Sequence, residues 1–251
     1  MSNGKVYLVG AGPGAPDLLT LRAADVLARA DVVFHDALVH PDTIGLARSA
    51  ERIAVGKRCG KHSTAQRFIN KRLIDAARKH RVVVRLKGGD PMLFGRAQEE
   101  IAALENAGID YEVVPGVTAA LAASAELGIS LTRRGAARSV AFVTPRVGEG
   151  EKANAWARAA AASDTAVIYM GAGQAGLIAS ALLAQGLSAA TPVVVVESAS
   201  LPERRQWRLA LRDLARIADF GVTGPALILV GEVYADVLQE ADATSTDARC
   251  A

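Results

Sequence analysis

Two glycine-rich segments follow strand-like runs in this sequence, and both offer bare backbone to a ligand. The first, GAGPGAPD, spans residues 10–17 and comes directly after Val6-Tyr7-Leu8-Val9. The second, KGGD, spans residues 87–90 and comes after RVVVRL. Because glycine has no Cβ, it lets a ligand or another loop approach the backbone closely. We therefore expect a small charged ligand, whether a phosphate, a nucleotide or a sulfonium compound.

The first segment matches part of the dinucleotide-binding fingerprint. Gly10, Gly12 and Ala15 fit the pattern GxGxxG/A. Asp36 ends the next strand-like run about 20 residues further on, where a dinucleotide fold has its ribose-binding carboxylate. One hypothesis is therefore an oxidoreductase that binds NAD(P) at GAGPGA.

Two prolines in the same segment argue against that hypothesis. A dinucleotide turn needs its third small residue to open the helix on whose N-terminus the pyrophosphate rests. Pro13 and Pro16 interrupt the segment, and Asp17 is a natural N-cap for a helix that starts near Leu18. The segment is longer and more rigid than a dinucleotide turn.

Composition indicates a folded protein that binds neither membranes nor nucleic acid. The 251 residues are 51% hydrophobic, which suits one large α/β unit or two smaller ones. The N-terminal segment lacks the apolar region of a secretory signal, and no span approaches the ~20 apolar residues of a membrane helix. We therefore expect a cytoplasmic protein. A net charge of +3 is too small to predict nucleic-acid binding.

The cysteines and histidines do not predict a metal site. Cys59 and Cys250 lie far apart, and the four histidines have neither HExxH nor HxH spacing. We therefore expect no metal.

Strand-like and helical patterns alternate along almost the whole chain. Strands are predicted at residues 6–10, 31–36, 51–55, 81–87, 111–114, 139–144, 165–170, 192–197 and 225–231. Helices are predicted at residues 18–30, 43–48, from Ser63 onward, and at 97–107, 117–128, 152–162 and 174–185. The stretch ERRQWRLALRDL is a candidate outer strand followed by a helix. Such alternation with short glycine-marked loops predicts mainly parallel sheets.

These elements predict an α/β protein of two lobes. Residues 1–115 form the N-terminal lobe with the substrate and catalytic loops, and residues 116–133 form a linker helix region. Residues 134–240 form the C-terminal lobe, and residues 241–251 are a polar tail.

The order of seven segments identifies the kind of protein. They are VYLVGAGPG, HDALV, VGKRCGKHS, VVRLKGGDPMLFGR, VVPGVTAALAASAELGI, YMG and GPALILVGE. The set resembles the tetrapyrrole methylase family from Gly4 to near Val237. Within that family, VGKRCGKHS together with RLKGGDPMLFGR is similar to the uroporphyrinogen-III C-methyltransferases, which form precorrin-2.

The resemblance implies an activity and a fold. It implies two α/β domains, a homodimer, and S-adenosyl-L-methionine bound in the cleft between the lobes. The implied reaction is C-methylation of the tetrapyrrole uroporphyrinogen III at C-2 and C-7, with precorrin-2 and S-adenosyl-L-homocysteine as products. The product serves cobalamin or siroheme synthesis, and the residues do not distinguish these destinations.

The resemblance also assigns roles to individual residues. Asp36 corresponds to the proton acceptor and Lys57 to the proton donor. Arg58, Lys61 and Arg96 are candidates for binding the carboxylates of the substrate. The implied cofactor contacts are Pro13, Gly88, Gly89, Asp90, Leu93, Thr118, Ala119, Met170 and Ala199.

Purely structural roles are alternatives for some of these residues. Asp36 also suits a helix cap, Asp90-Pro91 suits a plain turn, and Lys57 suits an exposed surface. Thr118 suits a first-turn helix residue that bonds to backbone, and Met170 suits a core position between sheet and helix.

Several residues depart from the family pattern. They are Ala15, Ala97-Gln98, Arg133 and Pro145-Arg146. They leave open a related tetrapyrrole methylase with another methylation site. A non-enzymatic, two-lobed solute-binding or sensor module is a third hypothesis beside the methyltransferase and the oxidoreductase.

Overall fold

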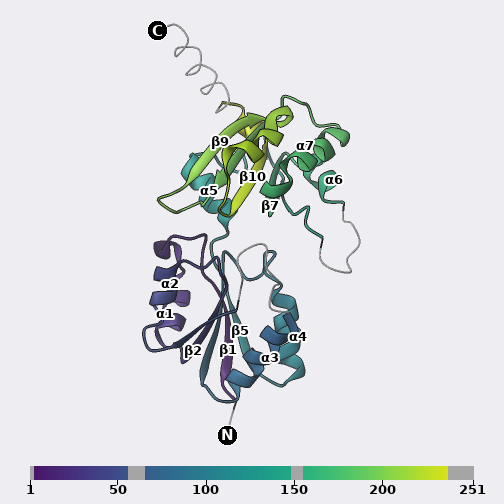
Figure 1. Cartoon of the computed structure of the whole chain (residues 1–251). Helices are drawn as coiled ribbons and strands as arrows, with labels where there is room; N and C mark the ends of the chain where they lie inside the picture. The colour runs from purple at the N-terminus through teal and green to yellow at the C-terminus, as the bar shows by residue number, and fades with distance from the viewer. Residues whose placement is uncertain (1–2, 56–65, 148–154, 237–251) are drawn as a thin grey trace. The chain divides into compact units, whose positions relative to one another are not determined.

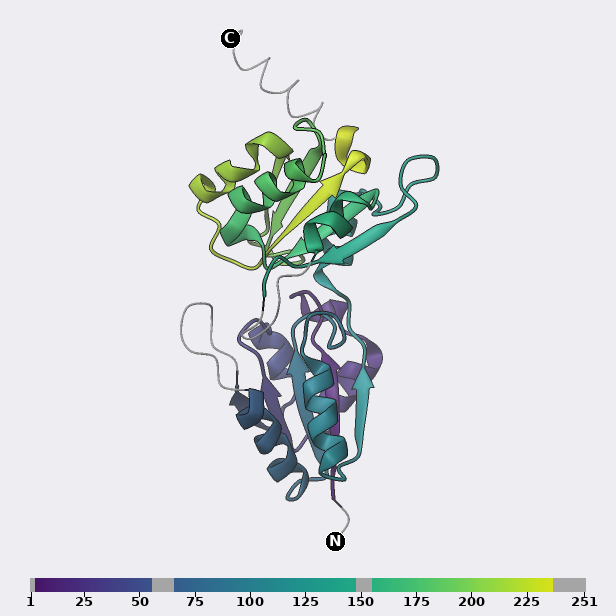
Figure 2. The ribbon, with the colours of Figure 1, turned by 90° about the vertical axis from the view of Figure 1, so that its right-hand side faces the viewer.

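The chain folds as two α/β units that meet inside one helix. A computed structural model describes residues 3–55, 66–147 and 155–236. The first unit ends at Ala122 and the second begins at Ala123, within α5 (Ala119–Leu127). Each unit has a five-stranded sheet covered by helices (Figures 1 and 2), which confirms the prediction of two α/β lobes.

The sheet of the first unit is parallel throughout, as the sequence predicts. Its strands are β1 (Lys5–Gly10), β2 (Val32–His35), β3 (Glu51–Ala54), β4 (Val82–Lys87) and β5 (Tyr111–Val114). Their order is β3-β2-β4-β1-β5, and each pairing is parallel. All five strands therefore end at the same edge of the sheet, the edge where α/β folds bind ligands.

Helices cover both faces of this sheet. The helices are α1 (Leu21–Ala28), α2 (Pro41–Gly45), α3 (Gln66–Ala77) and α4 (Ala97–Asn106). In Figure 1, α1 and α2 lie on one face, and α3 and α4 lie on the other. Tyr7 and Val9 of β1 accordingly pack with α1, whereas Val6 packs with α3. Burial on both faces explains why the central strands are continuous apolar runs rather than alternating ones.

The first helix begins later than the sequence predicted. Asp17 is not its N-cap, because it lies in a separate 3-10 turn, Pro16–Leu18. Leu19 is extended, with φ −69° and ψ 145°, so no helix runs through it. The N-cap of α1 is Thr20, whose hydroxyl accepts a hydrogen bond from the amide of Ala23 at 3.2 Å.

The sheet of the second unit is mixed. Its strands are β6 (Val140–Val143), β7 (Thr165–Tyr169), β8 (Pro192–Glu197), β9 (Arg205–Ala210) and β10 (Ala226–Gly231), in the order β6-β7-β10-β8-β9. Only the pairing of β6 with β7 is parallel among these described strands. The prediction of mainly parallel pairing is therefore wrong for this sheet. Residues 198–204 between β8 and β9 are too few for the crossover that parallel neighbours need.

The remaining elements of the second unit surround this sheet. They are α6 (Trp156–Ala161), α7 (Ala175–Ala184) and the 3-10 segments Ala172–Gln174, Leu211–Phe220 and Glu232–Tyr234. Ile178 of α7 and Leu214 of the long 3-10 segment share one core with Ile168 of β7. The predicted outer strand is confirmed as β9, at the edge of the sheet.

A buried carboxylate fixes the segment that follows β8. Glu197 is 3% exposed. Its Oε1 accepts hydrogen bonds from the amides of Thr223 at 2.7 Å and Gly224 at 2.5 Å, and its Oε2 accepts one from Arg205 Nε at 2.7 Å. Burial by itself raises the pKa of Glu197. The two amides and Arg205 outweigh that effect and hold the pKa below its ordinary value of 4.5.

This carboxylate makes the stability of the fold depend on pH. A carboxyl whose pKa is lowered by folding stabilises the fold above its unfolded pKa, and the contribution is lost as the pH falls through the folded pKa. We expect Glu197→Gln to lower the free energy of unfolding by about 1.5–3 kcal/mol at neutral pH. The difference from the parent should shrink below about pH 4.

Urea unfolding of both proteins across this pH range measures the effect. Glu203→Gln, at an exposed position in the loop that follows β8, is the matched control and should behave as the parent does. A difference between the parent and Glu197→Gln that stays constant down to about pH 3 would contradict the prediction.

Candidate active site

The two glycine-rich segments lie at the point where the direction of the chain reverses in the first sheet. β1 and β4 are neighbours, yet the chain runs from β1 to α1 on one face and from β4 to α4 on the other. In open α/β sheets, ligands bind outside the carboxyl ends of the strands at such a switch point.

Three loops touch one another here through their backbones. The amide of Gly89 donates to the carbonyl of Gly12 at 2.7 Å, and the amide of Gly12 donates to the carbonyl of Gly89 at 3.2 Å. The third loop follows β5, and a Cβ on its Gly116 would overlap the carbonyl oxygen of Gly89 and lie 2.9 Å from Gly10 Cα. Glycine is therefore required at Gly116 because backbones fill the space around it.

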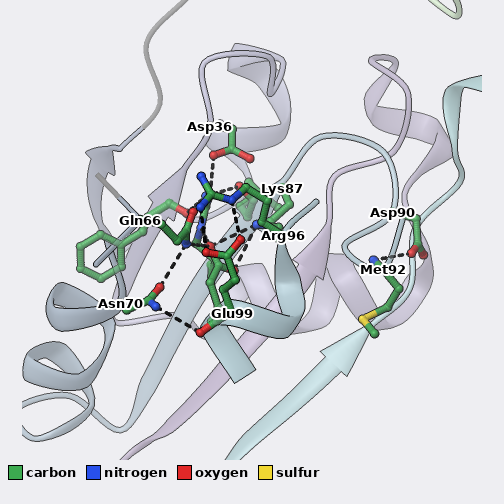
Figure 3. Close-up of polar contacts among 12 residues, drawn as sticks. Asp36, Gln66, Asn70, Lys87, Asp90, Met92, Arg96 and Glu99 are labelled. Atoms are coloured by element: carbon green, nitrogen blue, oxygen red, sulfur yellow. Dashed lines mark hydrogen bonds and ion pairs between the residues drawn. The ribbon is translucent and has the colours of Figure 1, made fainter. Parts of the chain in front are cut away.

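Asp90 joins two of these loops. Its Oδ1 accepts a hydrogen bond from the amide of Met92 at 2.8 Å (Figure 3), and its Oδ2 accepts one from the amide of Gly116 at 2.9 Å. The turn at Asp90-Pro91 is therefore present, and Leu93 donates its amide to the carbonyl of Asp90 at 3.3 Å. Thr118 is also close, because a Cβ on Gly89 would lie 4.0 Å from its Cα.

Asp36 lies at the same edge, directly after β2. Its amide donates to the carbonyl of Leu86 at 3.2 Å, which extends the pairing of β2 with β4. The side chain of Asp36 is 31% exposed, and its Oδ1 accepts a hydrogen bond from Arg85 Nη2 at 2.5 Å. A side-chain cation rather than a helix terminus therefore binds this carboxylate.

A buried cluster of charges lies behind Asp36 (Figure 3). Glu100 of α4 is fully buried, and Arg85 and Lys87 of β4 are each 3% exposed. Glu100 Oε1 accepts hydrogen bonds from Arg85 Nε at 3.0 Å, Lys87 Nζ at 3.1 Å and Gln66 Nε2 at 3.0 Å. We assigned no role to Arg85, Lys87 or Glu100 from the sequence. The signal was the i, i+2 spacing of the two cations, which sets both on one face of a buried strand.

The two cations of this cluster respond differently to burial. Burial by itself lowers the pKa of the Arg85 guanidinium, but Asp36 and Glu100 outweigh it and raise that pKa. Burial also lowers the pKa of the Lys87 ammonium, and the neighbouring Arg85 lowers it further. Arg85 is therefore a permanent cation, while Lys87 has the weaker hold on its proton.

In the second unit, Met170 and Ala199 follow two strands that end at one edge. β7 and β8 both run antiparallel to β10, and Leu227 pairs with Tyr169 on one side and with Val196 on the other. Met170 has φ 57° and is 45% exposed, so the alternative of a core position is wrong. Ala199 is buried between Ser198 and Ser200, which both have positive φ.

The remaining predicted site residues are placed as follows. Pro13 is half-buried in the loop after β1, and Ala119 begins α5. Arg96 is exposed, with φ 55°, and its Nε and Nη2 donate to the two carboxylate oxygens of Glu99 at 2.6 and 2.7 Å. Lys57, Arg58 and Lys61, like the predicted helix start at Ser63, lie outside the described residues.

The described residues offer neither a metal-binding cluster nor a membrane-spanning helix. Within residues 3–55, 66–147 and 155–236, no group of three or more His, Cys, Asp or Glu side chains is arranged to hold a metal ion. Over the same ranges, none of the helices combines the length and apolar character that crossing a membrane requires.

The strand order argues against a dinucleotide site. β4 lies between β1 and β2, so the strand that carries Asp36 is not the neighbour of the strand that leads into GAGPGAPD. The helix after that loop begins only beyond its cap at Thr20, so no helix N-terminus directly follows the glycines. The first unit is therefore a parallel α/β sheet with three glycine-containing loops in contact, and a carboxylate, at its switch point.

Comparison with known proteins identifies the family. Residues 5–215 match the Tetrapyrrole (Corrin/Porphyrin) Methylases. The chain is 45% identical over 239 residues to a uroporphyrinogen-III C-methyltransferase of Pseudomonas aeruginosa, covering 95% of this chain and 97% of that protein. It therefore belongs to the tetrapyrrole methylase family.

Solved and longer relatives agree with this membership. A crystal structure of uroporphyrin-III C-methyl transferase from Thermus thermophilus, complexed with S-adenyl homocysteine, superposes with a TM-score of 0.81 at 43% identity. The superposition covers 92% of this chain and 98% of that one. The siroheme synthase of Azotobacter vinelandii is 46% identical over 92% of this chain, but the chain spans only half the length of that protein.

The contact of the three loops predicts which glycine the fold cannot replace. Gly116→Ala should lower the free energy of unfolding by about 1–3 kcal/mol, because the new methyl group forces the Gly89 backbone to move. Gly45→Ala is the matched control, since a Cβ there meets no atom within 4 Å. That variant should be neutral or more stable by up to about 1 kcal/mol. Urea unfolding measures the change in the free energy of unfolding for each variant. Equal changes for Gly116→Ala and Gly45→Ala would contradict the close backbone contact at Gly116.

Proposed function

We propose that this protein is an S-adenosyl-L-methionine-dependent C-methyltransferase that converts uroporphyrinogen III to precorrin-2 by methylation at C-2 and C-7. The observation that carries the proposal is the 45% identity to the Pseudomonas aeruginosa uroporphyrinogen-III C-methyltransferase over nearly the full length of both proteins. The superposition on the Thermus thermophilus enzyme with bound S-adenyl homocysteine supports the same cofactor. The matched siroheme synthases support siroheme as one destination of the product.

The glycine-rich edge at the switch point fits an adenosyl sulfonium compound. A Cβ on Gly88 would meet only the Cβ of Leu38, at 3.7 Å, so the backbone of Gly88 is open to a ligand. Asp90 contributes negative charge beside a cationic sulfur, while its oxygens stay bonded to the amides of Met92 and Gly116. We propose Pro13, Gly88, Gly89, Asp90, Leu93, Thr118 and Ala119 as cofactor contacts in the first unit. We propose Met170 and Ala199 as contacts in the second.

The chemistry requires positioning and removal of a proton. When bound, S-adenosyl-L-methionine supplies an electrophilic methyl group, which an electron-rich pyrrole carbon takes with release of S-adenosyl-L-homocysteine. Alignment of the two reactants supplies up to roughly 7–11 kcal/mol of the barrier reduction. The methylated ring is then positively charged and must lose a proton, and Asp36 is the proposed acceptor.

The substrate carries a rim of carboxylates that cations must hold. Arg58, Lys61 and Arg96 are the proposed ligands, and Lys57 is the proposed proton donor. Arginine binds carboxylates through two parallel hydrogen bonds, and Arg96 already makes such a pair with Glu99. A substrate carboxylate that binds Arg96 therefore replaces Glu99 as its partner.

The cellular form of the protein is also part of the proposal. The resemblance supports a homodimer in the cytoplasm, acting on a small tetrapyrrole and not on nucleic acid. Light scattering on the purified protein tests the dimer directly.

The decisive experiment is label transfer under anaerobic conditions. The protein is incubated with uroporphyrinogen III and methyl-labelled S-adenosyl-L-methionine, and the product mass is followed. Gain of two methyl groups is the expected result. Binding of S-adenosyl-L-homocysteine without methyl transfer would agree with a methylase, but it would show that uroporphyrinogen III is not the substrate. Binding of NAD(P) in place of S-adenosyl-L-homocysteine would overturn the methyltransferase proposal. Ligand binding without any turnover would favour a sensor.

Asp36 has a separate test. Asp36→Ala should lower the rate of label transfer by about 10²-fold or more, the usual contribution of a positioned proton acceptor, while affinity for S-adenosyl-L-homocysteine stays unchanged. Asp42→Asn, at an exposed carboxylate on α2, is the control and should keep the parent rate. If Asp36→Ala transferred label at the parent rate, Asp36 would not be the proton acceptor.

A further inference from the structure

The most unusual feature of the first unit is a fully buried glutamate with two cationic partners. Glu100 Oε1 and Oε2 each lie 3.1 Å from Lys87 Nζ, and Oε1 lies 3.0 Å from Arg85 Nε. Buried ion pairs are costly to desolvate and are often replaceable by apolar residues without loss of stability. Stability alone is therefore a weak reason for this cluster.

The guanidinium of Arg85 connects this cluster to the surface. Its Nε donates to Glu100 inside the protein, while its Nη2 donates to Asp36 Oδ1 at the carboxyl edge of the sheet. Its Nη1 donates to the carbonyl of Leu86 at 3.2 Å. A planar guanidinium fixed at Nε and Nη1 has one direction left for Nη2, and that direction is toward Asp36.

The remaining contacts hold Glu100 itself in place. Gln66 Nε2 donates to Glu100 Oε1 at 3.0 Å and to Asn70 Oδ1 at 3.0 Å. Gln66 and Asn70 both belong to α3. Helices α3 and α4 are thereby joined through the carboxylate that orients Arg85. Among the described residues, Asp36 Oδ1 is bound by Arg85, whereas Asp36 Oδ2 makes neither an ion pair nor a hydrogen bond.

We propose that Glu100 is a positioning residue for the methyl transfer: it fixes Arg85, and Arg85 holds Asp36 Oδ1 so that Oδ2 receives the proton that the positively charged ring loses after the methyl group has been transferred. This inference rests on the proposed function and adds two residues to its machinery. Glu100 and Arg85 touch neither substrate nor cofactor in this scheme, and they act through the orientation of Asp36. Lys87 balances the charge of Glu100, to which it donates its hydrogen bonds, and it donates none to Asp36.

The test separates orientation from stability by restoring the charge balance. Glu100→Met leaves two buried cations opposite one carboxylate and should lower both the melting temperature and kcat. Lys87→Met/Glu100→Met removes one charge of each sign and should recover much of the melting temperature. The double variant should still show kcat reduced on the order of 10²-fold, the effect of roughly 1 Å of misplacement. Its affinity for S-adenosyl-L-homocysteine should stay at the parent value.

Two more variants complete the design. Glu100→Gln keeps an oxygen that accepts from Arg85 Nε, so its kcat should fall between those of the parent and Glu100→Met. Glu105→Gln removes a carboxylate from an exposed position on the same helix and should leave kcat unchanged.

The outcomes separate this inference from the proposed function. An inactive parent protein would overturn the proposed function. An active parent together with a double variant that regains both stability and kcat would overturn only the role of Glu100, because the loss in Glu100→Met would then come from stability alone.

Discussion

Direct contact between three stretches of backbone is the constraint on which the first unit depends. Parallel pairing brings the ends of β1, β4 and β5 to one edge, but the loops beyond them can meet only where side chains are absent. Gly10, Gly89 and Gly116 meet this condition, and the carboxylate of Asp90 closes the contact. This contact between loops is therefore built into the fold itself, which is the preorganisation that alignment of two reactants requires.

Much of the first unit follows from the sequence because its strands are buried on both faces. Continuous apolar runs mark such strands clearly, and the glycines mark where they end. The neighbouring Glu99 and Glu100 show that the sequence pattern does not predict which polar side chain is buried. Both belong to one polar pair at the start of a helix, yet Glu99 is exposed and Glu100 is fully buried. The way α4 faces Arg85 and Lys87 decides the difference, and that depends on tertiary packing.

The second unit shows a different limit of sequence reasoning. Its strands were found where they were predicted, but their directions depend on which strands become neighbours. β10 inserts between β7 and β8 and runs opposite to both, a choice that no local pattern encodes. Similarly, Asp17 and Thr20 are both good caps, and the extended Leu19 between them selects Thr20. The candidate site was predicted mainly from the resemblance of the chain to a family. Its buried charges could not be predicted in this way, because their burial depends on tertiary packing.

The strand order of the first unit also determines how the chain folds. Strand β1 bonds to β4 and β5. Lys5 therefore pairs with Val82, and Val6 with Tyr111, only after those later residues have been added to the chain. Long loops must close before these contacts form, which makes folding slow. In the second unit, β8 and β9 pair across a short connection and need no such closure. During synthesis, the contact of Gly10, Gly89 and Gly116 therefore forms only after the chain as far as Gly116 has left the ribosome.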